Sequence, residues 1–300
     1  MLQKSPYRKR YWGAAIVALL LTVFVAYIML DTFVFESAIG PLSTPVPTAT
    51  AQSGADATPV PSPVEVISND TEYYDGDIHV KVETVDTGEV VYYVADIQLS
   101  DVKYLKTAFA KGQYGRNITE ATSTMAENNN AILAINGDYC GFRPDGIVIR
   151  NGALYRDTKR GELLAIKNNG DFEIIDDANV TGQQLVDQGV LHTLTFGPAL
   201  VIDGQYANRE SSVFRANPRT GVGQAGPLHY IFIVVDGRSD ESAGLNLQDF
   251  AQLFIDHGCS VAYNLDGGGT STMYMNGKVI NNPSYGSERR LSDILYIGKE

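Results

Sequence analysis

The sequence predicts an α+β domain, with a mixed central sheet, β-hairpins and a few helices, preceded by one transmembrane helix. Three observations lead to this fold class. Three short, continuous apolar runs have the composition of strands buried on both faces. Several further runs, rich in valine and tyrosine, flank turn residues in the manner of β-hairpins. One segment, residues 246–258, places apolar residues at helical spacing between an asparagine cap and a glycine stop.

The N-terminus predicts a membrane anchor. A charge-free apolar run covers residues 11–30, which is about 30 Å as a helix and enough to cross a bilayer core. A cleaved signal peptide is the alternative, although its apolar region is normally shorter and no clear small-x-small cleavage site follows. The basic flank, residues 1–10, is expected to stay in the cytoplasm. The protein is thus predicted to be a single-pass protein of the cell membrane, with its C-terminal domain extracellular.

A linker and one domain are expected to follow the anchor. Residues 31–65 are rich in proline, serine and threonine and predict an extended linker. Residues 66–300 then form one globular domain, long enough to bury a substantial core. The whole chain carries a net charge of −12, and no basic stripe interrupts it. This charge argues against a nucleic-acid partner, while it still permits an anionic substrate held by a few arginines.

Local signals place the other elements of the domain. Turns at residues 86–88, 151–152 and 276–277 predict three of the hairpins. Residues 117–129 predict a short helix, in which Asn117 caps the first turn and Glu120 completes a capping box. Residues 246–258 predict the best-defined helix of the chain.

Candidate site residues follow the three buried strands, which are expected at residues 131–135, 230–235 and 261–265. Each strand ends in a polar, glycine-flanked cluster: Asn136-Gly137-Asp138, Asp236-Gly237-Arg238 and Asp266-Gly267-Gly268-Gly269. If the strands are neighbours, these clusters meet in one crevice, as ligand-binding residues of open sheets often do. An ordinary turn remains the alternative for each cluster taken alone.

The glycine-rich loop at residues 267–269 continues with Thr270 and Ser271. It lacks the lysine and the following helix of a nucleotide-binding loop. Glycines allow close approach of a ligand, and successive backbone amides can bind an anion. Arginines supply the complementary charge, because a guanidinium binds phosphate oxygens in a fixed fork. The candidates are Arg219 with its neighbour Thr220, Arg238 and Arg289.

Neither a metal nor a cofactor is predicted. No two histidines stand at metal-ligand spacing. A Mg²⁺ or Ca²⁺ site that uses Asp138, Asp236 or Asp266 remains open. Cys140 and Cys259 permit either a disulfide bond or two separate buried thiols.

Several motifs together resemble the phosphodiester glycosidase family over residues 100–298. They are "AINGDY", "GPALVIDG", "NPRTGVG", "VVDGRS", "LDGGGTSTM" and "ERRLSDIL", in the family's order and spacing. Two positions depart from the family pattern: Asp138-Tyr139 follow Asn-Gly, and Thr270 stands where serine is frequent. Both departures concern the identity of the sugar more than the type of reaction.

The resemblance implies hydrolysis of a sugar 1-phosphodiester on the sugar side, releasing a free sugar and a phosphomonoester. Asp266 and Asp236 would be the catalytic carboxylates, and the substrate would be a phosphorylated glycan at the cell surface. The substrate-binding residues would be Asn136, Asp138, Arg219, Thr220, Gly237, Arg238, Gly267, Gly268, Gly269, Thr270, Ser271 and Arg289. Two alternatives stay open: a non-catalytic module that binds acidic polysaccharide in exopolysaccharide assembly, and a metal-dependent phosphodiesterase.

Overall fold

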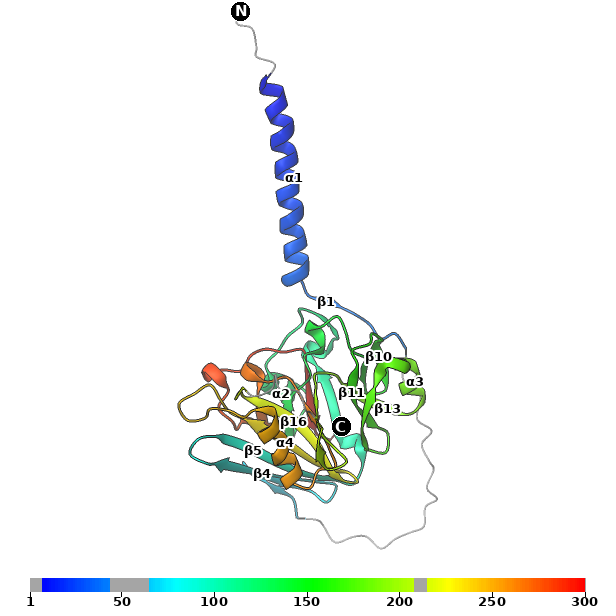
Figure 1. The fold of residues 1–300 in the computed structure, drawn as a ribbon, viewed down its shortest axis with the longest axis vertical. Coiled ribbons are helices and arrows are strands. Elements are labelled where there is room, and N and C mark those ends of the chain that lie inside the picture. Colours follow the sequence, from blue (N-terminus) through cyan, green and yellow to red (C-terminus); the bar gives the residue numbers. More distant parts are fainter. Residues whose placement is uncertain (1–6, 44–64, 208–214, 300) are drawn as a thin grey trace, which may run out of the picture.

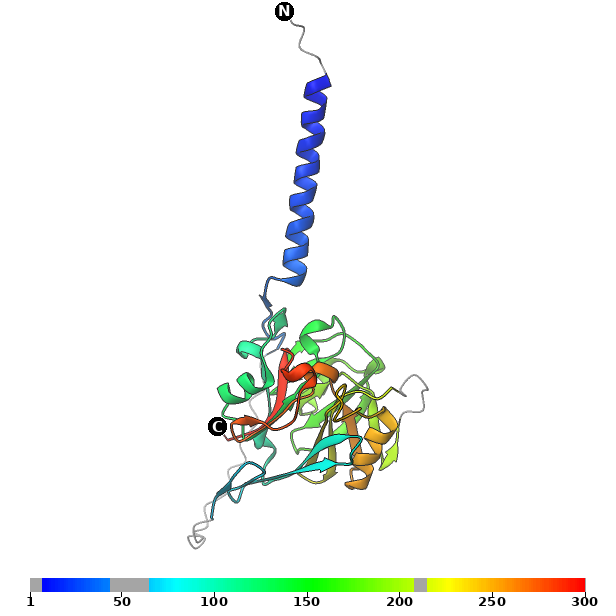
Figure 2. The same cartoon turned by 90° about the vertical axis from the view of Figure 1, so that its left-hand side faces the viewer.

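The structure, a computed structural model, describes residues 7–43, 65–207 and 215–299. Figure 1 shows a long helix that rises from a compact, sheet-rich domain, and Figure 2 shows the same arrangement from the side. Most of the expected linker, residues 44–64, lies outside the described residues, and so does the start of the basic flank, residues 1–6.

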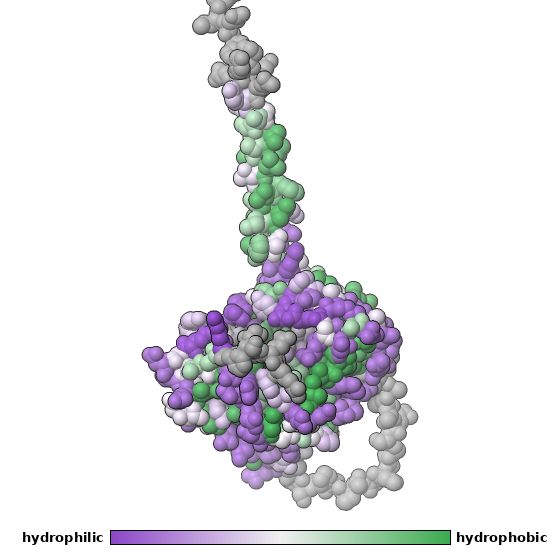
Figure 3. Space-filling model, viewed as in Figure 1, coloured by the Kyte–Doolittle hydropathy of each residue, from purple (hydrophilic) through white to green (hydrophobic). Residues whose placement is uncertain are grey.

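The long helix, α1 (Tyr7–Phe33), contains the expected anchor. Its segment Tyr11–Phe33 is long and apolar enough to cross a membrane, and none of that span is buried against the domain. Figure 3 shows apolar side chains along the helix, in contrast to the largely polar surface of the domain on this face. A membrane anchor and a signal sequence both have these properties.

The largest sheet has nine strands. Their order is β15 (Gln205–Tyr206), β14 (Ala199–Ile202), β18 (Val261–Asn264), β16 (Arg219–Gly226), β17 (His229–Val235), β5 (Val91–Leu99), β4 (Ile78–Asp86), β3 (Glu72–Tyr74) and β2 (Ile67–Ser68). Within the described residues, every pair in this sheet is antiparallel. β17 and β18 therefore flank β16 instead of pairing with each other, although a helix connects them in the chain.

A second sheet has five strands, in the order β20 (Lys278–Val279), β19 (Met273–Met275), β8 (Leu133–Asn136), β21 (Asp293–Ile297) and β6 (Leu105–Phe109). Three smaller sheets complete the domain. They join β12 (Phe172–Asp176), β11 (Glu162–Lys167) and β13 (Val190–Leu194); β9 (Val148–Arg150) and β10 (Ala153–Arg156); and β1 (Ser37–Ala38) with β7 (Gly115–Arg116).

The main core lies between the nine-stranded and five-stranded sheets. Side chains alternate along a strand, so β17 can serve two layers. Its residues Tyr230, Phe232 and Val234 enter the core shared with the five-stranded sheet. Ile231, Ile233 and Val235 point the other way and pack against a helix. This double burial explains why residues 230–235 form a continuous apolar run.

Helices cover the outer faces of the two sheets. α4 (Leu247–Asp256) is capped by Asn246, whose side chain accepts the Asp249 amide. The apolar face of α4 packs on the nine-stranded sheet. α2 (Thr122–Asn128) covers the five-stranded sheet through Met125 and Ala126. α3 (Gly182–Asp187) packs on the smaller sheets. The domain thus has the α+β class that the sequence predicts.

The predicted hairpins are confirmed, but the expected capping box is wrong. β4–β5, β9–β10 and β19–β20 are hairpins at the predicted turns. α2, in contrast, begins after Ala121, which offers no capping side chain, and the Glu288 carboxylate accepts the Ser123 amide of the first turn instead. Asn117 has a φ of 63° and donates its amide to the carbonyls of Thr32 and Phe35. The residue therefore ties the domain to the end of α1 instead of capping a helix.

Candidate active site

The predicted clusters meet at one end of the two main sheets. β16 runs antiparallel to β17 and β18, so its first residues lie beside their last ones, with Arg219 opposite Val235 and Gly221 opposite Asn264. β8 belongs to the other sheet, and its last residue, Asn136, bridges to this edge. The three strand-end clusters therefore come together where the two sheets meet, as the strand pattern predicts.

Asn136 is the bridge between the sheets. Its side-chain amide donates to the carbonyl of Asp266 at 2.6 Å, and its side-chain oxygen accepts the Thr220 hydroxyl at 2.7 Å and the Thr272 amide at 3.2 Å. Asn136 and Thr220 are both fully buried. These hydrogen bonds use both ends of the Asn136 amide group. Asn136 therefore fixes the backbone of Asp266 relative to Thr220 and Thr272.

Asp266 presents a carboxylate at the end of β18. One oxygen accepts the Gly267 amide at 2.9 Å, and the other lies 3.0 Å from the Arg289 guanidinium. Burial raises the pKa of Asp266, whereas Arg289, the Thr270 hydroxyl and the Gly267 amide lower it. Arg289 is half exposed, while the Asp266 side chain is almost buried. The carboxylate is thus held in place but has a cation at its solvent side.

The glycine-rich loop forms a 3₁₀ turn, η6 (Gly268–Thr270), packed against arginines. Gly268 has a φ of 68°, and a Cβ there would lie 3.1 Å from the Arg238 guanidinium. A Cβ at Gly267 would lie 2.7 Å from the carbonyl of Pro218. The amides of Gly267 and Gly268 already donate to Asp266 and Pro218. Glycine is therefore required at residues 267 and 268 chiefly because the Pro218 backbone and the Arg238 side chain approach them closely.

Two further predicted binding residues, Arg219 and Arg238, lie beside this loop. Arg219 donates to the carbonyls of Leu245 and Arg215, and burial together with the Arg238 charge lowers its pKa. Arg238 donates to the side chain of Asn217 at 2.9 Å. Arg289 contacts Asp266 and lies beside Gly269, so the side chains of Arg238 and Arg289 flank residues 266–269, whereas the Arg219 guanidinium is bonded to Leu245 and Arg215. This concentration of positive charge suits a phosphate.

Asp236 is placed differently from Asp266. Its two carboxylate oxygens accept the Asn281 side-chain amide at 2.8 Å and the Asn282 backbone amide at 3.0 Å. Burial raises its pKa, and these two hydrogen bonds and one with Tyr93 lower it. Asn281 also bonds the Ser271 carbonyl and the Met273 amide. Asp236 therefore anchors the segment that follows the glycine-rich loop.

Asp138 belongs to a buried ion network. The Arg150 guanidinium lies 3.0 Å from Asp138 and 2.8 Å from Asp293, and all three side chains are almost fully buried. Burial alone would lower the pKa of Arg150, but the two carboxylates raise it. Asp138 also accepts the amides of Cys140 and Thr195. These contacts fill its hydrogen-bonding capacity from inside the protein.

The three candidate ligands for Mg²⁺ or Ca²⁺ do not form one cluster in the described part of the chain. Asp138, Asp236 and Asp266 each have separate partners, as given above. Asp138, Cys140 and Asp293 do lie close enough to share an ion. The Arg150 guanidinium already occupies the position between the two carboxylates.

Cys140 and Cys259 are both buried free thiols, in different parts of the core.

The remaining predicted residues support the site through the backbone. Gly237 packs against Gly244, where a Cβ would lie 2.9 Å from the Gly244 Cα. Thr270 donates to the Gly267 carbonyl, and the buried Ser271 hydroxyl has no partner among the described residues.

Arg150, Asn281 and Asp293 were not predicted. Arg150 ends an apolar strand within a hairpin, and Asp293 opens another strand, so neither had a local signal of its role.

Comparison with known proteins gives the same fold and one family. A family model described as phosphodiester glycosidase matches residues 129–298, more than half of the chain. The SPbeta prophage-derived uncharacterized protein YomE of Bacillus subtilis is 32% identical over 197 residues, which is 61% of this chain and 30% of YomE. The chain thus spans less than a third of the length of that relative.

Two solved structures share the fold. The zebrafish N-acetylglucosamine-1-phosphodiester alpha-N-acetylglucosaminidase catalytic domain, auto-inhibited by its pro-peptide, matches with a TM-score of 0.63 and 18% identity. That match covers 79% of this chain and 87% of the zebrafish chain. A hypothetical protein from Synechocystis matches with a TM-score of 0.53 and 14% identity, over 74% of this chain and 62% of that one.

Proposed function

The chain belongs to the phosphodiester glycosidase family, and from this premise we propose that it hydrolyses a sugar 1-phosphodiester on the sugar side. The products are a free sugar and a phosphomonoester. The observation that carries the proposal is the Asp266 carboxylate, fixed by Gly267 and Arg289 at a strand end. A rigid carboxylate beside a cationic cluster combines the two groups that this reaction needs.

In the proposed reaction, water attacks the anomeric carbon and the bond from that carbon to the phosphate oxygen breaks. The bonding electron pair leaves with the phosphate, and Asp266 accepts a proton from the water. Burial raises the pKa of Asp266, which makes its carboxylate a stronger base than an exposed aspartate. A phosphate is a good leaving group, so its negative charge needs stabilisation more than protonation.

Arg219, Arg238 and Arg289 supply that stabilisation in our proposal. Arg238 and Arg289 flank residues 266–269, and Arg219 lies close enough to Arg238 for their charges to interact. A guanidinium matches two phosphate oxygens at once. We also assign sugar or phosphate contacts to Thr270 and to the Ser271 hydroxyl, which has no partner among the described residues. Asn136 and Thr220 act through the backbone of Asp266, and Asp236 acts through Asn281, so we assign these three residues a positioning role. Gly237 and Gly267–Gly269 shape the loops, and Asp138 stabilises the fold behind them.

We also propose that α1 is an uncleaved anchor and that the domain faces the cell exterior, where phosphorylated surface glycans are the substrates. The exposed apolar helix and the basic residues before it support this topology. In this arrangement residues 37–42 lie against the domain directly after the anchor.

The experiment that tests the function uses the full chain in detergent micelles with N-acetylglucosamine 1-phosphate methyl ester. Mass spectrometry should identify free N-acetylglucosamine and methyl phosphate. N-acetylglucosamine 1-phosphate with methanol, formed only without chelator, would instead identify a metal-dependent phosphodiesterase. Saturable binding of the ester without turnover would identify a non-catalytic glycan-binding module.

A further inference from the structure

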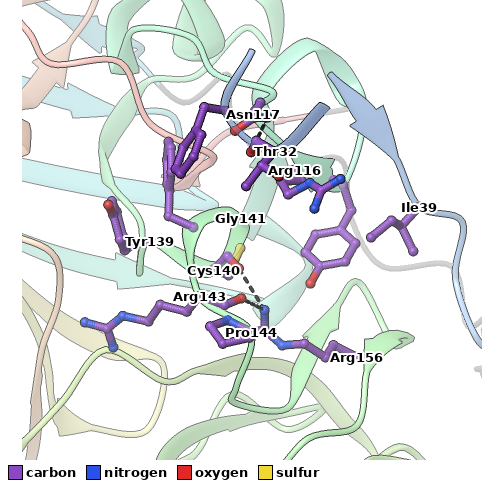
Figure 4. A pocket seen from close by; sticks show the side chains of 14 residues that line it. Thr32, Ile39, Arg116, Asn117, Tyr139, Cys140, Gly141, Arg143, Pro144 and Arg156 are labelled. Atoms are coloured by element: carbon purple, nitrogen blue, oxygen red, sulfur yellow. Dashed lines mark hydrogen bonds between the residues drawn. The ribbon is translucent and has the colours of Figure 1, made fainter. Parts of the chain in front are cut away.

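A pocket lies where the end of α1 meets the domain. It has a volume of about 530 Å³ and is shown in Figure 4. Thr32, Phe33 and Ile39 line it from the membrane side, and Tyr139, Phe142 and Arg143 line it from the domain. Figure 4 shows Ile39 and Arg116 at one end, and Tyr139 with the Arg143 guanidinium at the other. The pocket therefore extends from the helix end into the domain.

Hydrogen bonds hold the segment after α1 against the domain. Asn117 donates to the carbonyls of Thr32 at 3.1 Å and Phe35 at 3.0 Å. The Ile39 amide donates to the Tyr114 carbonyl at 2.7 Å, next to the β1–β7 pairing. Because these contacts follow α1 directly, the pocket mouth stays within a few residues of the helix end. A membrane crossed by α1 would therefore lie at the mouth.

Exposed apolar side chains surround this mouth. Phe33, Ile39 and Phe142, which line the pocket, are each at least two-fifths exposed. Clustered apolar exposure of this kind marks a surface that contacts lipid or another apolar group. The patch continues directly from the apolar surface of α1. The group that covers it is therefore expected to be a lipid of the bilayer that α1 crosses.

The domain end of the pocket lies near the candidate active site. Tyr139 follows Asp138, and the carbonyl of Gly137 accepts the Asp266 amide at 3.3 Å. Tyr139 has a φ of 66° and stacks on Phe142, with their ring centroids 4.4 Å apart. The Arg143 guanidinium lies 4.3 Å from the Phe196 ring centroid. Burial lowers the pKa of Arg143, and the charges of Asp138 and Asp266 oppose that change.

We propose that this pocket binds the lipid side of a sugar 1-phosphodiester whose alcohol is a membrane lipid. The apolar chain would leave the bilayer at Phe33, Ile39 and Phe142, and the sugar would lie toward Asp266. The phosphate between them would contact Arg143 in addition to the arginines beside residues 266–269. The pocket is too small for a long lipid, so most of the chain stays in the bilayer. This inference rests on the proposed function, because it names the substrate class of the same site.

The test compares two esters of N-acetylglucosamine 1-phosphate, one with methanol and one with a short isoprenoid alcohol. The full chain is assayed in phospholipid nanodiscs as wild type, as Phe142→Ser and as Ile202→Ser. Ile202 is the matched control, since it is an equally exposed apolar side chain on β14, outside the pocket lining. The wild type should favour the isoprenoid ester. Phe142→Ser should lower the isoprenoid-to-methyl ratio of kcat/KM by about tenfold, as loss of one large apolar contact would.

Equal ratios for the wild type, Phe142→Ser and Ile202→Ser would overturn the pocket assignment and leave the proposed function standing. If neither ester is cleaved, the proposed function fails, and binding decides the inference. Native mass spectrometry should then show the isoprenoid ester retained by the wild type and Ile202→Ser but not by Phe142→Ser. Equal retention, or none by the wild type, would overturn it. Ile39→Ser replaces Phe142→Ser if the latter does not fold.

Discussion

The Asp266 carboxylate lies 3.0 Å from the Arg289 guanidinium, which joins the end of β18 to the segment before β21. The pair brings together a base and a cation from residues far apart in the chain. Burial raises the pKa of Asp266, and Arg289 acts against this rise. Arg289 is therefore one of the groups that limit how basic Asp266 becomes, and its half-exposed side chain is accessible to a phosphate in our proposal.

Replacing Asp266 by asparagine should leave a folded protein with little activity. Asparagine keeps the size of the side chain but cannot accept the proton of the attacking water. Turnover should fall by ~10²–10⁴, the range typical of a lost acid–base group. Asp203→Asn, in the exposed turn before Gly204, is the control of equal charge change and should keep full turnover. Near-normal turnover of Asp266→Asn would contradict the assignment, and unfolding would make the residue structural.

Replacing Arg289 by glutamine should move the acidic limb of the pH–rate profile. The proposed base works only when ionised, so kcat/KM falls as the pH drops through the pKa of Asp266. Arg289 lowers that pKa, and its removal should raise it further. The acidic limb should therefore shift to higher pH. Arg290→Gln removes a neighbouring exposed arginine and should not shift it. A limb that stays in place in Arg289→Gln would show that Asp266 is not the titrating base.

Replacing Arg150 by methionine should strongly destabilise the domain. The substitution leaves the carboxylates of Asp138 and Asp293 buried without their shared cation. Removing one partner of a buried ion network lowers the free energy of unfolding by roughly 3–5 kcal/mol. Adding Asp293→Asn should restore part of this loss, because one buried charge disappears. Denaturant unfolding measures both effects.

The control for Arg150 is Arg160→Met, which breaks a partly exposed ion pair with Asp145. Such pairs contribute about 0–1 kcal/mol. Equal losses in Arg150→Met and Arg160→Met would contradict the structural role of the buried network.

Replacing Asn117 by aspartate should loosen the segment after α1. Aspartate tolerates the positive φ of this position but has no N–H groups to donate to Thr32 and Phe35. Two hydrogen bonds of about 1 kcal/mol each would be lost. Hydrogen exchange of the Ile39 and Leu42 amides should become faster by at least about tenfold, while exchange in β17 should not change. Unchanged exchange at residue 39 would mean that Asn117 does not hold the segment.

Local turn chemistry made much of the fold predictable. Asn151-Gly152 and Asn276-Gly277 all have positive φ, which these residue types tolerate, and both turns join the predicted hairpins. The apolar run at residues 230–235 predicted a strand buried on both faces because its two sets of alternating side chains serve two cores.

Contacts between distant residues were not predictable in this way. The local sequence predicts Asn117 as a helix cap, but its hydrogen-bond partners, Thr32 and Phe35, lie 85 and 82 residues earlier in the chain. The local sequence predicts Asp138 as a site residue, yet it shares the buried Arg150 guanidinium with Asp293 inside the protein. The clusters at the strand ends predicted which residues come together in the candidate site, whereas the contrast between Asp236 and Asp266 depends on Asn281 and Arg289. Only the folded chain brings those partners together.

The most direct measurement is hydrolysis of N-acetylglucosamine 1-phosphate methyl ester by the full chain in water enriched in the heavy oxygen isotope. If water attacks the anomeric carbon, the heavy oxygen enters the free sugar and the methyl phosphate keeps ordinary oxygen. Mass spectrometry of the two products should show this distribution, and Asp266→Asn should form neither product at a comparable rate. Heavy oxygen in the phosphate would contradict sugar-side cleavage.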